Sequence, residues 1–196
     1  MRKEEKSSEI NKTDVKIDPN LRITVKSIHK SEKPVIEIRT DAQLTGKVTV
    51  KIGTKTYVIN VVNGKGTKTI PSLKVGSYTA KAIFAGNDMF NSSEKSVTFK
   101  VTKDVIKLTL KKVKVKKSAK KLKITATLKI NGKKVKGKKL TFKFNKKTYK
   151  AKTNKKGLAK ITITKKVLKK LKVGKKVKYQ VSYSGKTVKR TVKIKR

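Results

Sequence analysis

The residues of this sequence that are best placed to do chemistry are its lysines, and the chemistry is the attraction of anions. Among 196 residues, 57 are Lys or Arg and 11 are Asp or Glu, which gives a formal net charge of +46. Residues 1–103 carry 20 basic and 10 acidic residues, whereas residues 104–196 carry 37 basic residues and one acidic residue, Asp104. A field of one sign over the second half predicts that this half meets an anionic partner.

The lysines of the second half alternate with apolar residues. In residues 121–129, Lys and Thr fill the outward positions of an expected strand. Lysines also discourage edge-to-edge pairing of sheets, but Glu would do so equally well, and Lys opposite Lys is destabilising. We therefore predict a diffuse polyanion-binding surface formed by Lys111, Lys112, Lys114, Lys116, Lys117, Lys120, Lys121, Lys133, Lys134, Lys136, Lys138, Lys139, Lys169, Lys170, Lys172, Lys175 and Lys176.

The identity of the polyanion stays open between an anionic cell-wall polymer, another polyanion and, as the alternative, nucleic acid. Lys attracts anions as a point charge and lacks the bidentate fork with which Arg reads guanine or clamps phosphate. No helix-turn-helix, RNP or zinc-finger pattern is present. The aromatic residues alternate on expected inward positions, which argues against a base-stacking platform formed by Phe142, Phe144, Tyr149, Tyr179 and Tyr183.

Catalytic and metal-binding patterns are missing from the sequence. His29 is the one His, there is no Cys, and no nucleophile elbow accompanies them. A calcium ion held near the linker by Asp41, Asp88 and Asp104 is disfavoured, because calcium takes six to eight oxygen ligands and no loop supplies them in series. We therefore expect a protein that is not an enzyme and that uses no cofactor or metal.

A repeated β unit positions these side chains. The stretch Gly46–Gly86 returns in altered form as Gly137–Gly185, and internal repeats of this kind reveal architecture. Both copies begin with Gly-Lys and later contain an identical Leu-Lys-Val-Gly. The other shared features are a Thr-Tyr pair (Thr56-Tyr57, Thr148-Tyr149), a turn (Asn63-Gly64-Lys65-Gly66, Asn154-Lys155-Lys156-Gly157) and a closing aromatic-x-Gly (Phe84-Ala85-Gly86, Tyr183-Ser184-Gly185).

Short alternating strands separated by turn residues predict an all-β protein. The expected architecture is two tandem immunoglobulin-like Greek-key β-sandwiches, with one short helical turn at residues 165–171 of the second. Residues 1–20 are expected to form a disordered or extended tail, residues 21–102 the first sandwich and residues 103–196 the Lys-rich second sandwich. Tyr78 and Tyr179 follow a Gly turn at the head of a penultimate strand, and this placement is typical of a tyrosine corner.

The run VTVKIGTKTYVINVVNGKGTKTIPSLKVGSYTAKAIFAGNDMFNSS resembles the bacterial-type Ig-like repeat of the adhesin-like surface proteins of methanogenic archaea. The Lys-rich half resembles the basic C-terminal module of the same proteins, through KINGKKVKGKKLTFKFNKKTYKAKTNKKGLAKITI and VLKKLKVGKKVKY. The resemblance covers residues 21–196. It implies a non-enzymatic role at the cell surface or wall, with a protein or glycan ligand as a candidate partner of the first module.

Two compartments stay open on the sequence alone. The first 20 residues contain charges but no apolar core of a secretory signal, and no run approaches the ~18 apolar residues of a membrane span. The resemblance favours an extracellular or surface location, with no transmembrane segment. The missing leader favours the alternative, a cytoplasmic basic protein associated with nucleic acid.

Overall fold

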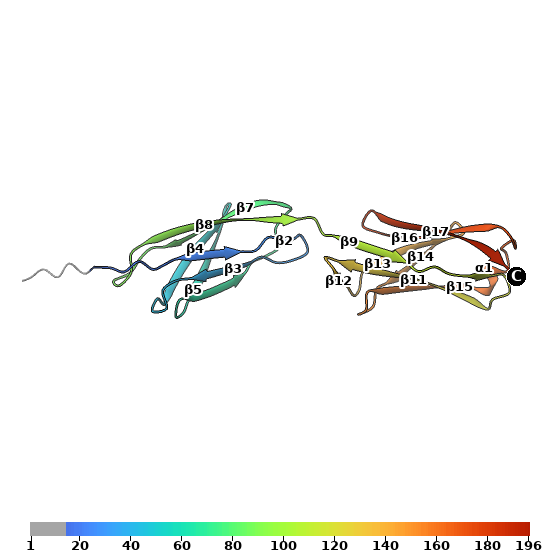
Figure 1. Ribbon diagram of the computed structural model, residues 1–196, viewed down its shortest axis with the longest axis horizontal. Coiled ribbons are helices and arrows are strands. Elements are labelled where there is room, and N and C mark those ends of the chain that lie inside the picture. Colours follow the sequence, from blue (N-terminus) through green and yellow to red (C-terminus); the bar gives the residue numbers. More distant parts are fainter. Residues whose placement is uncertain (1–14) are drawn as a thin grey trace, which may run out of the picture. The chain divides into compact units, whose positions relative to one another are not determined.

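The computed structural model describes residues 15–196, and the chain divides into two compact units, Met1–Lys103 (unit 1) and Asp104–Arg196 (unit 2). Each unit is built from two β-sheets (Figure 1). The single helix among the described residues is the short α1 (Lys165–Leu168). The all-β prediction and the short helical turn in the second sandwich are thereby confirmed, because period-two alternation and turn residues are signals that act locally along the chain.

Unit 1 has a three-stranded sheet in the order β1 (Arg22–Val25), β3 (Val35–Arg39) and β6 (Lys65–Thr69). Its second sheet has the order β2 (Ile28–His29), β8 (Ser93–Thr102), β7 (Gly76–Phe84), β4 (Gly46–Ile52) and β5 (Lys55–Val61). All of these pairs are antiparallel except β2 with β8. Alternate residues of β4, including Val48 and Val50, are fully buried between the sheets, as the period of a strand requires.

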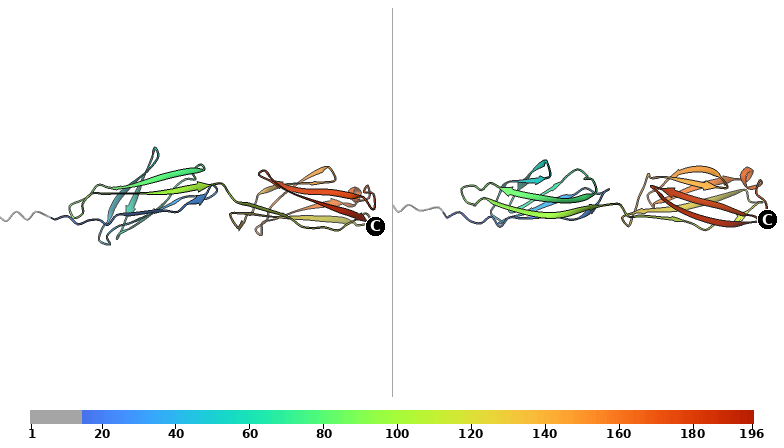
Figure 2. Two further views of the ribbon diagram at one scale, coloured as in Figure 1. Left: turned by 45° about the horizontal axis from the view of Figure 1, so that its top comes forward. Right: turned by 90° about the horizontal axis from the view of Figure 1, so that it is seen from above.

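Unit 2 repeats this plan (Figure 2). One sheet has the order β12 (Lys133–Lys134), β11 (Lys121–Ile130) and β15 (Leu158–Thr164), and β9 (Ile106–Leu110) also pairs with β11. The other has the order β10 (Val115–Lys116), β17 (Lys186–Lys195), β16 (Lys176–Tyr183), β13 (Lys139–Phe144) and β14 (Lys147–Lys152). The core between them contains the fully buried Leu128, Phe142 and Phe144.

In both units the first strand changes sheets. After pairing antiparallel with its first partner, the chain crosses over and pairs parallel with the last strand, as β2 does with β8 and β10 does with β17. In unit 1 the crossover is short, and the backbone N–H of Lys100 donates to the Ser27 hydroxyl at 3.0 Å. In unit 2 it comprises residues 111–114 and therefore carries three of the lysines predicted to bind anions.

Four two-residue turns have positive φ at both positions, which is the signature of a type I′ turn. Three of them place Gly second, namely Asn63-Gly64, Asn131-Gly132 and Ser184-Gly185. The fourth is Asn145-Lys146, in which Lys146 adopts a φ of 66°. A residue with a side chain loses about 1 kcal/mol of stability in this left-handed conformation, whereas Gly adopts it without strain. The Asn145-Lys146 turn is therefore less favourable than the other three, which have Gly at the second position.

Residues 1–20 are the predicted disordered or extended tail. Residues 1–14 lie outside the described residues, but residues 15–20 run along unit 1 and bond to its backbone. The Ile17 N–H donates to the Met89 carbonyl and the Asn91 N–H donates to the Ile17 carbonyl, both at 2.9 Å. The Asp41 N–H donates to the Pro19 carbonyl at 2.8 Å. Composition alone indicated a tail because these bonds use backbone groups, which every sequence carries.

The two copies of the repeat align differently in space than in sequence. The Thr40 N–H donates to the Gly64 carbonyl at 2.9 Å, and the Leu128 N–H donates to the Gly157 carbonyl at 2.8 Å. Each bond extends a strand ladder by one residue, so Gly157 is the counterpart of Gly64 and not of Gly66. Both glycines have positive φ, and a Cβ on either one would lie 2.6 Å from a backbone oxygen.

Candidate polyanion-binding surface

All of the lysines predicted to bind a polyanion are exposed in unit 2. Most of them lie in loops between the strands. On the strands, alternation exposes the lysines: β11 buries Ile124, Ala126 and Leu128, and leaves Lys121 and Lys123 in solvent. No acidic residue of unit 2 offsets them except Asp104, whose carboxylate accepts from the Asn131 side-chain amide at 2.9 Å. The outer face of unit 2 is therefore cationic, with its sole acid held at the start of the unit.

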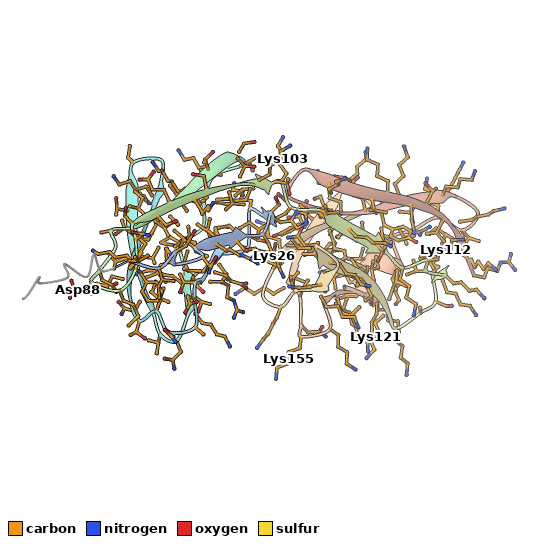
Figure 3. The ribbon with its side chains drawn as sticks, turned by 60° about the vertical axis from the view of Figure 1, so that its left-hand side comes forward. Lys26, Asp88, Lys103, Lys112, Lys121 and Lys155 are labelled. Atoms are coloured by element: carbon orange, nitrogen blue, oxygen red, sulfur yellow. The ribbon has the colours of Figure 1, made fainter. Side chains whose placement is uncertain are left out.

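The predicted lysines fall into two groups at opposite ends of unit 2, because strand direction decides to which end each loop belongs. Figure 3 shows Lys112 toward one end and Lys155 toward the other. The linker-end group belongs to β12, the following loop and the start of β13: Lys133, Lys134, Lys136, Lys138 and Lys139. The far-end group belongs to the loops around β9, β10 and α1: Lys111, Lys112, Lys114, Lys116, Lys117, Lys120, Lys121, Lys169, Lys170, Lys172, Lys175 and Lys176.

Backbone hydrogen bonds tie the far-end segments to one another. The Gly174 N–H donates to the Ile194 carbonyl and the Ile194 N–H donates to the Lys175 carbonyl, both at 2.9 Å. The Lys117 N–H donates to the Lys195 carbonyl at 3.0 Å, and the Asn145 N–H donates to the Lys178 carbonyl at 3.2 Å. Four segments distant in sequence thus form one surface.

This surface contains a cavity of about 220 Å³. Its lining combines four exposed lysines with three buried apolar side chains and one amide: Asn145, Lys170, Leu171, Lys172, Lys175, Lys176, Val177 and Ile194. A lining of lysines and apolar side chains is suited to an anionic group attached to carbon. The sequence indicated the lysines but missed Asn145, for which the Asn-Lys turn after β13 is the available signal.

The two predicted tyrosine corners differ. The Tyr78 hydroxyl donates to the Lys74 carbonyl, four residues upstream, at 2.7 Å, and its ring stacks on Phe99. The Tyr179 prediction is wrong, because its hydroxyl lies 3.3 Å from both the Lys111 carbonyl and the Val113 N–H, on the first-strand crossover. The physical reason is the register of the strand that carries Tyr179.

Tyr179 occupies the place of Ala80 and not that of Tyr78. Ile52 ends β4 and pairs with Ala80, whereas Phe144 ends β13 and pairs with Tyr179. The additional residues after Gly174 therefore place the Tyr179 ring at the next inward-facing position along the strand, two residues after the place that Tyr78 occupies in unit 1. The Tyr179 side chain is 2% exposed there, and its hydroxyl reaches the crossover. Together with the Arg190 Nε, which donates to the Leu110 carbonyl at 2.7 Å, it anchors the segment that carries Lys111, Lys112 and Lys114.

We expect Tyr179→Phe to lower the free energy of unfolding of unit 2 by about 1–2 kcal/mol, because it leaves a part-buried carbonyl and a part-buried N–H without their partner. Tyr78→Phe is the control, and its more exposed hydrogen bond is worth about 0.5–1 kcal/mol to unit 1. Urea unfolding followed by amide NMR signals of each unit measures both. Equal losses in the two variants would contradict the anchoring role of Tyr179.

The candidate catalytic and calcium-binding residues are not brought together. His29 lies in β2, with its Nδ1 3.0 Å from the Thr102 hydroxyl and 3.2 Å from the Lys103 carbonyl. Asp41 and Asp88 follow β3 and β7 and lie at the end of unit 1 remote from β2, whereas Asp104 starts unit 2. Within residues 15–196, no group of three His, Cys, Asp or Glu side chains is placed to hold a metal ion.

The aromatic residues of unit 2 are packed inward. Phe142, Phe144 and Tyr179 are buried, and Tyr149 and Tyr183 pack half-buried against the same core. Base stacking requires exposed rings, so these five side chains supply no platform.

Unit 1 has an open cavity of its own, with a volume of about 410 Å³. Its lining is mostly polar and includes the negatively charged Asp18 and the positively charged Arg22 and Lys95.

Comparison with known proteins shows likeness in structure alone. No protein-family model and no curated protein matches the chain. It is similar to fibronectin(III)-like modules of CbhA from Clostridium thermocellum, with 18% identity, a TM-score of 0.31 and coverage of 88% of this chain and 93% of that one. It is also similar to a Ca2+-stabilized, ice-binding adhesin of an Antarctic bacterium, with 16% identity and a TM-score of 0.35. That alignment covers 88% of this chain and about half, 49%, of the adhesin.

A third similar structure is a chimeric titin Z1Z2, with 11% identity, a TM-score of 0.45 and coverage of 91% of this chain and 97% of that one. No helix in the part of the chain that the structure describes is long and apolar enough to cross a membrane.

Proposed function

We propose that this chain is a non-enzymatic, adhesin-like protein of the cell surface or cell wall, in which unit 2 attaches to an anionic wall polymer by electrostatic attraction. The observation that carries the proposal is the exposure of every predicted anion-binding lysine in a unit whose single acid is Asp104. The resemblance of residues 21–196 to adhesin-like surface proteins supports the location. Unit 1 serves as a spacer, and its polar cavity is the candidate contact for a protein or glycan ligand.

The attachment is diffuse and multivalent. A polyanion that binds releases condensed counterions, so affinity grows with the number of charges neutralised and falls steeply with salt. Each exposed Lys–anion contact is weak, and the strength comes from many contacts on one polymer chain. Two groups of lysines at opposite ends of unit 2 extend the length of polymer that one unit engages.

The alternative is an intracellular basic protein associated with nucleic acid. The net charge of +46 favours it, since charge of this magnitude binds DNA without sequence preference. The inward packing of the unit 2 aromatics disfavours it, because single-stranded nucleic acid is held by stacking on exposed rings.

Co-sedimentation of the full chain with isolated cell walls, at physiological salt and with excess duplex DNA as competitor, distinguishes these functions. We expect retention on the walls despite the DNA. A variant with Lys169, Lys170, Lys175 and Lys176 changed to Gln should be retained less strongly and elute at lower salt. Changing Lys47, Lys51, Lys55 and Lys65 of unit 1 to Gln should leave retention unaltered. Transfer of the unmodified chain to the DNA would overturn the proposal and favour the nucleic-acid function.

A further inference from the structure

We propose that the far-end cavity of unit 2 is a discrete site for a single phosphate monoester, carried as an end group or substituent by the anionic polymer to which the unit attaches. This inference rests on the proposed function and deepens it, because it places one specific contact within an otherwise diffuse surface. The cavity is the one of about 220 Å³ lined by Asn145, Lys170, Leu171, Lys172, Lys175, Lys176, Val177 and Ile194.

The dimensions of the cavity set the size of the ligand. Pockets for drug-sized molecules span roughly 300–1,000 Å³, and this cavity is smaller. It therefore accepts one charged group with the carbons next to it. Leu171, Val177 and Ile194, which are 5%, 5% and 3% exposed, supply apolar contact for those carbons.

The charges around the cavity select for phosphate over carboxylate. Four lysines surround a volume that holds one group, and the single acid of the unit, Asp104, lies at the other end. A phosphate monoester carries about −1.5 to −2 charges at neutral pH and offers three acceptor oxygens. A carboxylate carries one charge, so four ammonium groups favour phosphate by charge density as well as by the number of hydrogen bonds they donate.

The strained turn beside the cavity is an independent pointer to function. Asn145 lines the cavity, and its neighbour Lys146 keeps a φ of 66° where the three comparable turns have Gly. Residues held in sparsely populated backbone conformations cluster at functional sites, so the strained turn supports a function for this segment. A fifth positive charge next to the cavity is a function that Gly could not supply.

The far end differs from the linker end in its acids. At the linker end, the Asp104 carboxylate and the Asn131 amide lie beside β12 and the turn that precedes it, and they lower the positive potential there. The far end has no acidic side chain, so its side chains give it a higher positive potential. The linker-end lysines are consequently the matched control for the cavity.

Amide NMR of the full chain, titrated with inorganic phosphate or glycerol phosphate at constant ionic strength, tests the proposal. We expect saturable shifts at Asn145, Leu171, Val177 and Ile194, and weaker, non-saturating shifts with acetate. Lys170→Gln with Lys175→Gln should weaken phosphate binding about fivefold or more, whereas Lys134→Gln with Lys136→Gln should change it less than about twofold. Shifts spread equally over both ends, or no saturation, would overturn the site.

The variant Lys146→Gly separates a structural role of Lys146 from a role in phosphate binding, because a purely structural role would leave the phosphate affinity unchanged. We expect it to raise the urea midpoint of unit 2, because Gly relieves the turn, and to weaken phosphate binding about twofold. An unchanged phosphate affinity would remove the strained turn as support and count against the site.

Binding of the same variants to three partners identifies the source of the phosphate and tests the proposed function separately. The partners are isolated walls, poly(glycerol phosphate) that ends in a phosphate monoester, and vesicles that contain phosphatidic acid. We expect the Lys170 and Lys175 pair of substitutions to weaken polymer binding more than the Lys134 and Lys136 pair. If both pairs of substitutions weaken polymer binding equally, the attachment is diffuse over unit 2 and the proposal of a discrete site is overturned. Saturable phosphate binding without wall binding would instead overturn the proposed function. A loss confined to the vesicles would overturn the polymer as the source.

Discussion

Raising NaCl from about 50 to 200 mM is expected to weaken binding of the full chain to duplex DNA, used as a defined polyanion, roughly 10³-fold. The expected slope of log affinity against log salt concentration is about −5, which corresponds to six neutralised phosphates. The physical reason is counterion release by the exposed lysines of unit 2, whose 37 basic residues face one acid. Fluorescence anisotropy with a labelled duplex, repeated at several salt concentrations, measures the slope.

Two sets of substitutions assign this slope to a surface. Changing Lys170, Lys172, Lys175 and Lys176 to Gln should make the slope less steep by up to about 0.9 for each phosphate that the variant no longer neutralises. Changing Lys47, Lys51, Lys55 and Lys65 of unit 1 should leave it within about one unit of the original value. The same change in slope from both sets would show that net charge, and not the surface of unit 2, determines the interaction.

Gly157→Ala is expected to lower the free energy of unfolding of unit 2 by about 3 kcal/mol. Two costs add. Gly157 has a φ of +70°, which an L side chain rarely adopts, and an added Cβ would lie 2.6 Å from the Leu128 carbonyl oxygen. That oxygen belongs to β11, the central strand of its sheet, so the clash is relieved only by moving backbone that is paired on both sides. Urea unfolding monitored through unit 2 amide signals measures the loss.

Gly132→Ala is the matched control. Gly132 has a similar φ of +77°, but nothing lies within 4 Å of an added Cβ. Gly132→Ala therefore loses only the about 1 kcal/mol that an L side chain costs at positive φ, without a steric clash. Comparable losses in the two variants would show that the approach of Gly157 to β11 is loose enough to accommodate a methyl group. The amide signals of unit 1 should be unaffected in either variant.

Much of the fold was predictable because its signals are local. Alternation of period two placed Val48, Val50, Ile124 and Leu128 on inward faces, and the structure buries them. The Asn-Gly pairs at Asn63 and Asn131 predicted turns, since Asn and Gly tolerate positive φ, and both pairs adopt it. The cationic character of unit 2 likewise follows from composition, and exposure of the lysines follows from alternation.

Other features depend on which strand lies beside which. The sequence paired Gly157 with Gly66 and Tyr179 with Tyr78, because spacing along the chain carries no information about cross-strand register. Register makes Gly157 the counterpart of Gly64, and it moves Tyr179 into the place of Ala80, where its hydroxyl anchors the first-strand crossover.

The candidate site shows the same division. Sequence alone determined that the second half of the chain is a one-signed, outward-facing set of lysines, since residue type and strand period are sufficient for that. Only the tertiary structure decided that strand direction separates these lysines into a linker-end and a far-end group, and that backbone bonds between Gly174, Lys175 and Ile194 help to close a cavity at the far end. A cavity forms between segments that are distant in the chain. Local residue patterns do not determine which distant segments pair, so the cavity could not be predicted from them.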